Sequence, residues 1–335
     1  MGRIVRLHRL GGPEELRLEA AEPDGLRAGE VLIRVQAFGL NNSEAQLRRG
    51  DYPMLKASLP TRIGRECTGI VEAAGEGVAM PRPGARVSTI PAFDVQRHGV
   101  YGEWCIVPAT ATVPVPADLP IIEAAAIWQQ YLTAFGPLVE HGRVAAGETV
   151  LVTAGASSVG LGAIQMARLL GARVIATTRS PGKREVLLRA GAEHVIVTGE
   201  EDLAKRIGEI TAGRGFDLAL DPIAGPHLAT LAEVAATEAR IFLYGQLSAD
   251  PAPFPLIPVL RKGLTLRGYT LWEITMNAAR RERAIGFVLE HVEAGRLRPV
   301  IDRVFRLDEI VEAHRYLESG RQAGKIVVRT DGWSE

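Results

Sequence analysis

The alternation of strand-like and helix-like segments between residues 149 and 244 is the feature that most constrains the fold of this chain. Short apolar runs rich in β-branched residues predict strands at Thr149–Thr153, Arg173–Thr178, Val195–Val197, Phe216–Leu220 and Arg240–Tyr244. Helical periodicity, with capping and exit signals, fills the intervals at residues 159–170, 181–190, 202–211 and 228–236. Such an alternation predicts an α/β fold with a doubly wound parallel sheet.

The segments on either side of this stretch have a different texture. The first 120 residues or so are rich in short β-type runs separated by glycine and proline, beginning with a strand at Met1–Arg6, as in a compact, mostly β domain. Two prolines in Thr112–Pro116 remove ladder donors, so this segment is expected at an edge. Glu123–Val139 is rich in alanine and is expected to be a helix. After Leu271 we expect a helix at Ala278–Glu293, a strand at Arg303–Phe305, a helix at Leu307–Leu317 and a last strand at Lys325–Arg329, although the pattern alone does not place these elements in the fold.

The link between the predicted strand Thr149–Thr153 and the helix at residues 159–170 is a turn of small residues. It contains Gly155, Ser157, Ser158, Val159 and Gly160. A turn of this kind lets a pyrophosphate approach the backbone, and the start of the helix supplies free N–H groups and a partial positive charge. The middle glycine of the usual dinucleotide fingerprint is absent, and any βα connection can resemble this turn. The position of the turn within a complete βαβ unit favours dinucleotide binding.

The end of the predicted strand Arg173–Thr178 indicates which dinucleotide is bound. NAD-binding units place an acidic residue about 20 residues after the glycines, where it accepts hydrogen bonds from the ribose. This chain has no acid there and instead offers the hydroxyls of Thr178 and Ser180 and the three cations Arg179, Lys183 and Arg184. Cations would neutralise a 2′-phosphate and hydroxyls would donate to it. The alternative is a set of solvated surface charges, although cations are unfavourable at the start of a helix. We predict that NADP(H) is the cofactor.

Composition excludes several classes of partner. The formal net charge is zero, so no general positive field would attract nucleic acid. No apolar run approaches the ~20 residues needed to cross a bilayer, and no membrane association is expected. The two cysteines, Cys67 and Cys105, are too few for a disulfide framework, which favours a cytoplasmic location. No CxxC or HExxH motif predicts a metal site.

The order and spacing of several motifs along nearly the whole chain resemble the zinc-independent branch of the medium-chain dehydrogenase/reductase superfamily, close to the quinone oxidoreductases. The motifs are Gly39-Leu40-Asn41-Asn42-Ser43, Arg49-Gly50-Asp51-Tyr52-Pro53, Gly64-Arg65-Glu66-Cys67-Thr68-Gly69, Gln130-Tyr131-Leu132-Thr133-Ala134, the turn above, Phe216–Asp221 and Ala323-Gly324-Lys325-Ile326-Val327-Val328.

This resemblance implies a GroES-like, mostly β domain at residues 1–122, completed by residues 272–335, and a Rossmann domain at residues 123–271. It also implies a homodimer and a substrate cleft between the domains. Ser43 and Arg65 stand near the positions where zinc alcohol dehydrogenases carry a cysteine and a histidine ligand. Because arginine cannot act as a ligand, we expect no metal.

The resemblance also assigns roles to residues outside the turn. It places Asn42 and Tyr52 in the cleft, with Tyr52 as a candidate donor to the substrate carbonyl or, alternatively, a packed loop residue. It places Thr133, Gly245 and Gln246 near the cofactor. It assigns Lys325 to the cofactor or to closure of the cleft, although a surface role for that lysine is nearly as plausible.

Three functions remain open from the sequence. The first is an NADPH:quinone reductase with one-electron or two-electron chemistry, acting on a small electrophile. The second is an NADPH-dependent enoyl or alkenal reductase on the same scaffold. The third is a non-catalytic protein that binds NADPH. Without a metal, hydride transfer would depend on positioning and on hydrogen-bond donors, which suits an acceptor already activated by conjugation.

Overall fold

The computed structural model describes residues 2–330 and divides them into two compact units. One unit contains the described residues up to Gln129 and from Pro299 onward, and the other is Gln130–Arg298. The domain limits expected at residues 122 and 271 stay a prediction. Met1 of the expected first strand and residues 331–335 of the expected C-terminal segment lie outside the described residues.

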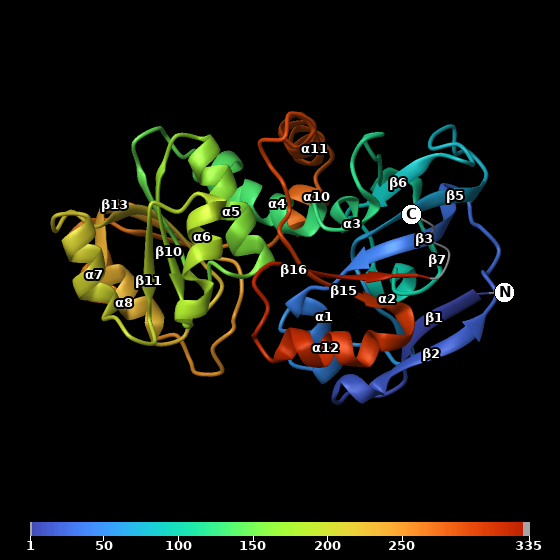
Figure 1. The fold of residues 1–335 in the computed structure, drawn as a ribbon, viewed down its shortest axis with the longest axis horizontal. Coiled ribbons are helices and arrows are strands. Elements are labelled where there is room, and N and C mark those ends of the chain that lie inside the picture. Colours follow the sequence, from blue (N-terminus) through green and yellow to red (C-terminus); the bar gives the residue numbers. More distant parts are fainter. Residues whose placement is uncertain (1, 331–335) are drawn as a thin grey trace. The chain divides into compact units, whose positions relative to one another are not determined.

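The Gln130–Arg298 unit is built on six parallel strands (Figure 1). In sequence order these are β9 Thr149–Val152, β10 Arg173–Thr178, β11 His194–Val197, β12 Phe216–Asp221, β13 Ala235–Leu243 and β14 Thr265–Gly268. The strands lie in the order β11-β10-β9-β12-β13-β14 and pair in parallel. This arrangement confirms the predicted doubly wound sheet, because the chain proceeds from β9 to one side and returns on the other at β12.

Helices precede, connect and follow these strands. They are α4 Trp128–Phe135, α5 Ser158–Leu169, α6 Arg184–Ala190, α7 Leu203–Ile210, α8 His227–Val234, α9 Leu256–Lys262, α10 Trp272–Thr275 and α11 Ala278–Glu293. Buried residues of the strands, such as Leu151, Ile175 and Ile241, pack in one cluster with Ile207 of α7 and Leu231 of α8. The apolar positions of α7 and α8 are therefore buried together with those of the strands.

Two expected elements are wrong. The expected helix Glu123–Val139 is broken into α3 Ile121–Ala124, α4 and a π-helical turn at Gly136–Glu140. Pro137 cannot donate a main-chain hydrogen bond, so regular α-helical bonding stops there. The strand expected at Arg240–Tyr244 starts instead at Ala235, because Ala235 pairs with Phe216 and tertiary pairing outweighs its helical propensity.

The other unit is β-rich and contains two sheets. The larger has the order β15-β16-β3-β5-β6-β8, with β7 also paired to β3, and the smaller has the order β2-β1-β4. The strands are β1 Gly2–Leu7, β2 Leu16–Ala21, β3 Glu30–Gly39, β4 Thr61–Arg62, β5 Cys67–Ala74, β6 Arg86–Thr89, β7 Trp104–Pro108, β8 Thr112–Pro114, β15 Ile301–Arg306 and β16 Lys325–Arg329. The edge position of β8 confirms the expectation from its prolines.

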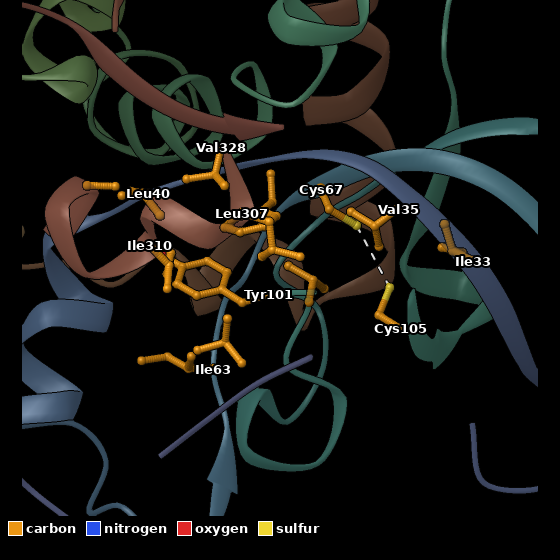
Figure 2. Packing of buried hydrophobic residues seen from close by; sticks show 14 of the residues in the cluster. Ile33, Val35, Leu40, Ile63, Cys67, Tyr101, Cys105, Leu307, Ile310 and Val328 are labelled. Carbon is orange, nitrogen blue, oxygen red and sulfur yellow. Dashed lines mark hydrogen bonds between the residues drawn. The ribbon is translucent and has the colours of Figure 1, made fainter. Parts of the chain in front are cut away.

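The core of this unit draws on both ends of the chain. Figure 2 shows Ile63 and Tyr101 packed with Leu307 and Ile310, which precede and begin α12 Ile310–Glu318. Another short helix, α1 Asn42–Arg49, follows β3 directly. Cys67 and Cys105 are buried free thiols whose sulfur atoms lie 3.8 Å apart (Figure 2). Because β16 pairs with β3, the C-terminal strands complete the sheet that the N-terminal segment begins.

Candidate functional site

The strand order of the parallel sheet indicates where a ligand would bind. β9 and β12 are neighbours, yet the chain continues from them to opposite sides of the sheet. Ligands of doubly wound sheets bind at the carboxyl ends of the strands at such a reversal. There the hydroxyl of Thr153, just after β9, donates a hydrogen bond to the fully buried carboxylate of Asp221 at the end of β12. Asp221 also accepts from the main-chain N–H of Ala224 at 2.8 Å, so it holds both loops at this edge.

The predicted cofactor turn lies at this edge, between β9 and α5. Ser157 caps α5, and its hydroxyl oxygen accepts a hydrogen bond from the N–H of Gly160 at 3.0 Å. The first turn of a helix leaves four N–H groups without helical partners, and Ser157 satisfies one of them. Among residues 2–330 the N–H groups of Ser158 and Val159 have no acceptor, and both residues are half-buried. The start of α5 therefore offers two donors at its partially positive end.

The backbone of this edge is tightly folded. A Cβ at Gly160 would lie 2.6 Å from the carbonyl oxygen of Gly155, so a side chain there would open the turn. Gly155 itself donates its N–H to Thr177 at 2.8 Å, which ties the turn to β10. Ala154 and Ala224 have positive φ angles of 47° and 55°, a conformation that costs energy in residues with a Cβ. Strained backbone on both sides of the reversal is typical of a functional site.

The predicted cations after β10 differ in whether their side chains have partners within the protein. Arg184 is committed within the protein, donating at 2.7 Å to the carbonyl of Val195 and at 2.7 Å to the carboxylate of Glu201. Arg179 is exposed, and its side chain has no hydrogen bond or ion pair among residues 2–330. Lys183 ends the short 3-10 helix Pro181–Lys183 and is half-buried. The cation available to a ligand here is Arg179.

The hydroxyls predicted beside these cations form a local turn. The side chain of Thr178 is buried, and its hydroxyl oxygen accepts from the main-chain N–H of Ser180 at 3.3 Å. Ser180 is exposed and precedes the 3-10 helix. The hydroxyl nearest the solvent is therefore that of Ser180.

The segment after β13 also lies at the carboxyl edge of the sheet. Gly245 and Gln246 are exposed, and the chain just beyond them is tied to the loop after β12 by the bond from the N–H of Leu247 to the carbonyl of Pro222, at 2.9 Å. Sequence reasoning missed Tyr244. Its hydroxyl is buried beside the Ser157 side chain, and burial and the charge of Asp221 raise the pKa of Tyr244 well above its ordinary value. The signal that could have found it is its place at a strand end.

Thr133 lies in α4 and is buried, with 6% of its surface exposed. The neighbouring Tyr131 donates a hydrogen bond from its hydroxyl to Gln165 of α5 at 2.7 Å. A Cβ at Gly162 of α5 would lie 3.2 Å from the Tyr131 ring, so α4 packs closely on the helix that starts at the turn.

The β-rich unit contains a buried polar cluster that the sequence did not reveal. The ammonium group of Lys325 on β16 is fully buried, donates to Asn41 Oδ1 at 2.6 Å and forms an ion pair with Glu66. The amide nitrogen of Asn41 donates to Glu66 and to Glu44, each at 3.3 Å. The second carboxylate oxygen of Glu66 accepts from the N–H of Gln129 at 2.9 Å. The predicted Lys325 is thus a buried residue and not a surface lysine.

The other predicted residues of this unit lie around the cluster. Asn42 is the first residue of α1 and is exposed, whereas Asn41 beside it makes the buried contacts. Tyr52 is half-buried, and the guanidinium carbon of Arg65 lies 5.2 Å from the centre of its ring. Arg65 Nε is 3.8 Å from Glu44 Oε1, so Arg65 lies between Tyr52 and the cluster.

Within residues 2–330, no three or more histidine, cysteine, aspartate or glutamate side chains are grouped so that they could hold a metal ion. No helix in the same residues is long and apolar enough to cross a membrane.

Two stretches of the chain match known protein families. Residues 27–117 match the family described as alcohol dehydrogenase GroES-like domain, and residues 190–328 match the family described as zinc-binding dehydrogenase. These matches confirm the GroES-like domain expected from the resemblance.

Individual relatives agree with the family matches. The chain is 30% identical to the quinone oxidoreductase of Lama guanicoe, and the match covers 97% of each. It is 33% identical over 318 residues to a phenolphthiocerol/phthiocerol polyketide synthase protein of Mycobacterium tuberculosis, covering 93% of this chain but 14% of that protein. The structure of Escherichia coli quinone oxidoreductase complexed with NADPH matches with a TM-score of 0.89 and 26% identity, covering 98% of this chain and 99% of that one.

The carboxyl group of Glu44 gives a testable pH dependence. Burial raises the pKa of Glu44 to about 7, although Arg65 and Lys325 act to lower it. The folded protein then binds a proton more tightly than the unfolded chain, so this contribution to stability is present below about pH 4.5 and is lost as the pH rises through 7. We expect the free energy of unfolding of the wild type to fall relative to that of Glu44→Gln over this range, by at most about 1.4 kcal/mol per pH unit.

Urea denaturation at several pH values measures this difference. The exposed Glu76, in the same unit, provides the control Glu76→Gln, which should follow the wild type. Equal slopes for the wild type and Glu44→Gln would contradict the assignment.

Proposed function

This chain belongs to the quinone oxidoreductase family of the medium-chain dehydrogenase/reductase superfamily, and we propose that it is an NADPH-dependent reductase of quinones or other conjugated carbonyls. The family membership supports an oxidoreductase. NADPH as the cofactor of this chain, and the kind of acceptor, are the proposal. The Escherichia coli relative named above was solved with NADPH, which favours the same cofactor here.

The observation that carries the proposal is the pair of N–H groups at Ser158 and Val159, which have no acceptor among residues 2–330. They belong to the first turn of α5, where the strand order predicts a ligand. A pyrophosphate supplies anionic acceptors for such donors and interacts favourably with the helix dipole. The residues present therefore fit a dinucleotide, with Gly155 and Gly160 allowing the tight turn and Ser157 holding it.

The phosphorylated dinucleotide is favoured by the residues at the end of β10. Arg179 is exposed and has no partner among residues 2–330, while Ser180 offers an exposed hydroxyl and Lys183 a second cation. A 2′-phosphate would supply acceptors for these groups. Thr178 supports them by holding Ser180 in its turn. Thr133, Gly245 and Gln246 remain proposed cofactor contacts from the resemblance.

The bound nicotinamide would supply a hydride, and the chain would position the acceptor and supply the proton. We propose Tyr52 as the donor to the acceptor oxygen. The guanidinium of Arg65 near the Tyr52 ring supports this role, because this cation–π contact would hold the ring in place. Asn42, at the start of α1, is a proposed cofactor contact, and Lys325 orients Asn41 in the buried cluster. Arginine at position 65 fits a metal-free site, since it cannot be a ligand.

Enoyl thioesters and enals are the second candidate class of acceptor. They are favoured by the 33% identity to a stretch of a polyketide synthase, a protein that by its name assembles polyketides. A protein that binds NADPH without catalysis is the third reading.

We also propose a homodimer and a cytoplasmic location. β14 is the edge strand of the parallel sheet and is partly exposed, so its free ladder groups can pair with a second copy. The preceding segment and α9 expose the apolar side chains of Phe254, Leu256, Ile257 and Leu260. Two free thiols 3.8 Å apart fit a reducing compartment.

The cofactor assignment predicts a selective loss. The double variant Arg179→Ala with Lys183→Ala should weaken NADPH binding about 10- to 100-fold, because charge-assisted hydrogen bonds to the 2′-phosphate are lost. NADH has no such phosphate and should bind almost unchanged. Titration calorimetry with both cofactors measures the difference. Arg168→Ala is the control, since Arg168 is equally exposed and also has no side-chain partner among residues 2–330. Equal losses for the two cofactors would contradict the assignment.

The acceptor class is tested by following NADPH oxidation with quinones, 2-alkenals and enoyl thioesters as separate substrates. We expect kcat/KM to be highest for quinones, and product stoichiometry separates one-electron from two-electron transfer. A preference for enals or enoyl thioesters would replace the quinone proposal with the second candidate. Tight NADPH binding with no oxidation by any of them would establish the non-catalytic reading.

The donor role of Tyr52 predicts a loss in kcat. Tyr52→Phe removes the hydroxyl and keeps the ring, so we expect kcat to fall about 100-fold while NADPH affinity is unchanged. Tyr316→Phe removes a hydroxyl that binds Asp302 at 2.9 Å and should leave kcat unchanged. If Tyr52→Phe instead lowers the melting temperature and keeps kcat, the hydroxyl has a packing role.

A further inference from the structure

A cavity of about 380 Å³ lies in the Gln130–Arg298 unit, apart from the turns proposed to hold the cofactor. Its lining consists of Glu140, His141, Arg143, Arg240, Phe242, Thr265 and Arg267. On β13 and β14, Arg240 pairs with Thr265 and Phe242 with Arg267. Alternate residues on a strand share one face, so these four belong to the same side of the sheet, at its β14 edge. A cavity of this size falls in the range of small-molecule sites.

The charged groups of this lining are unevenly paired. Glu140 is already engaged by Arg283 at 2.8 Å and by Arg280 at 3.2 Å. Arg240 donates to Glu148 at 2.5 Å and to the carbonyl of Gly142. The single acidic residue of the lining is thus neutralised from outside it, and Arg267 is paired with Glu273, which leaves Arg143 as the lining arginine without an ion pair among residues 2–330.

Arg267 has a donor without an acceptor. Its Nη2 donates to Glu273 at 2.6 Å, whereas its Nη1 is buried and has no hydrogen-bond partner among residues 2–330. A buried donor of a charged group that is left unsatisfied is costly, so an acceptor from a ligand would stabilise the structure. Burial and then the charge of Arg267 lower the pKa of His141, which keeps that ring neutral at pH 7.

Arg143 is a second arginine of the lining that could bind an acceptor group of a ligand. It is exposed, and its side chain has no hydrogen bond or ion pair among residues 2–330. Its φ angle of 50° lies in the left-handed region, which is unfavourable for a residue with a side chain.

We propose that this cavity binds a small organic anion, whose carboxylate or phosphate group accepts hydrogen bonds from Arg143 and Arg267. Arginine forms paired hydrogen bonds with both kinds of oxyanion, so the head group is defined by this shared chemistry. The site does not depend on the proposed reductase function, because none of its residues is assigned to the cofactor or to the acceptor.

The test measures the binding of inorganic phosphate and of citrate by the full-length protein at constant ionic strength. Titration calorimetry should give saturable binding to the wild type, and comparison of the two probes separates a phosphate from a carboxylate head group. Arg143→Gln should weaken binding about tenfold or more, through the loss of charge-assisted hydrogen bonds. Arg267→Gln should do the same. Arg168→Gln is the matched control and should bind as the wild type does.

A second background separates this cavity from the cofactor site. The variant Arg179→Ala with Lys183→Ala should retain the anion binding, even if it has lost NADPH. Because Arg143 is exposed and has no internal partner to lose among residues 2–330, Arg143→Gln decides the question if Arg267→Gln does not fold.

Three results would overturn the proposal. The first is the absence of saturable binding of either probe to the wild type. The second is an equal response of Arg143→Gln and Arg168→Gln, which would indicate non-specific attraction. The third is a change of oligomeric state in Arg143→Gln without any effect of anions, which would assign these arginines to contacts between copies of the chain.

Discussion

The buried ion pair between Lys325 and Glu66 holds together parts of the β-rich unit that are far apart in the sequence. Taking two charges out of water is costly, and good geometry with further hydrogen bonds must offset that cost. Asn41 supplies those bonds by accepting from Lys325 and donating to Glu44 and Glu66. The N–H of Gln129 donates to the second carboxylate oxygen of Glu66.

The same interaction dictates the backbone around it. A Cβ at Gly39 would lie 2.6 Å from Lys325 Cε and 2.8 Å from Glu66 Oε1, so only glycine lets β3 pass the ion pair. Helix α1 begins shortly after Gly39 and carries Glu44 into the cluster. Gln129, whose N–H binds Glu66, is the last residue before the Gln130–Arg298 unit. The end of β3, the start of α1 and the last residue of this unit before Gln130 therefore all contact the same buried cluster.

How much the sequence could predict depended on the range of the interaction involved. Arg173–Thr178, Ala278–Glu293 and Lys325–Arg329 have the predicted bounds, because local periodicity and capping define them. The turn after β9 was also predicted at its observed place between a strand and a helix, because its signal is local, while its role in cofactor binding stays a prediction. What escaped prediction is long-range: Lys325 and Glu66 are 259 residues apart, and nothing near either residue shows that it is buried with the other. Arg184 looked as available as Arg179 until its bond to Glu201 was known.

The Gln130–Arg298 unit departs from full hydrogen-bond pairing in two informative places. The chain as a whole has equal numbers of basic and acidic residues, and many of its arginines are engaged by carboxylates. Folded proteins rarely leave donors without acceptors where burial makes the omission costly. At the start of α5 the groups without partners among residues 2–330 are main-chain N–H groups, and in the cavity at β13 and β14 they are the guanidinium of Arg143 and the Nη1 of Arg267. The first arrangement suits a phosphate close to the backbone, whereas the second suits a head group approached by long side chains. The difference in donor type is the physical reason to treat them as two separate anion sites.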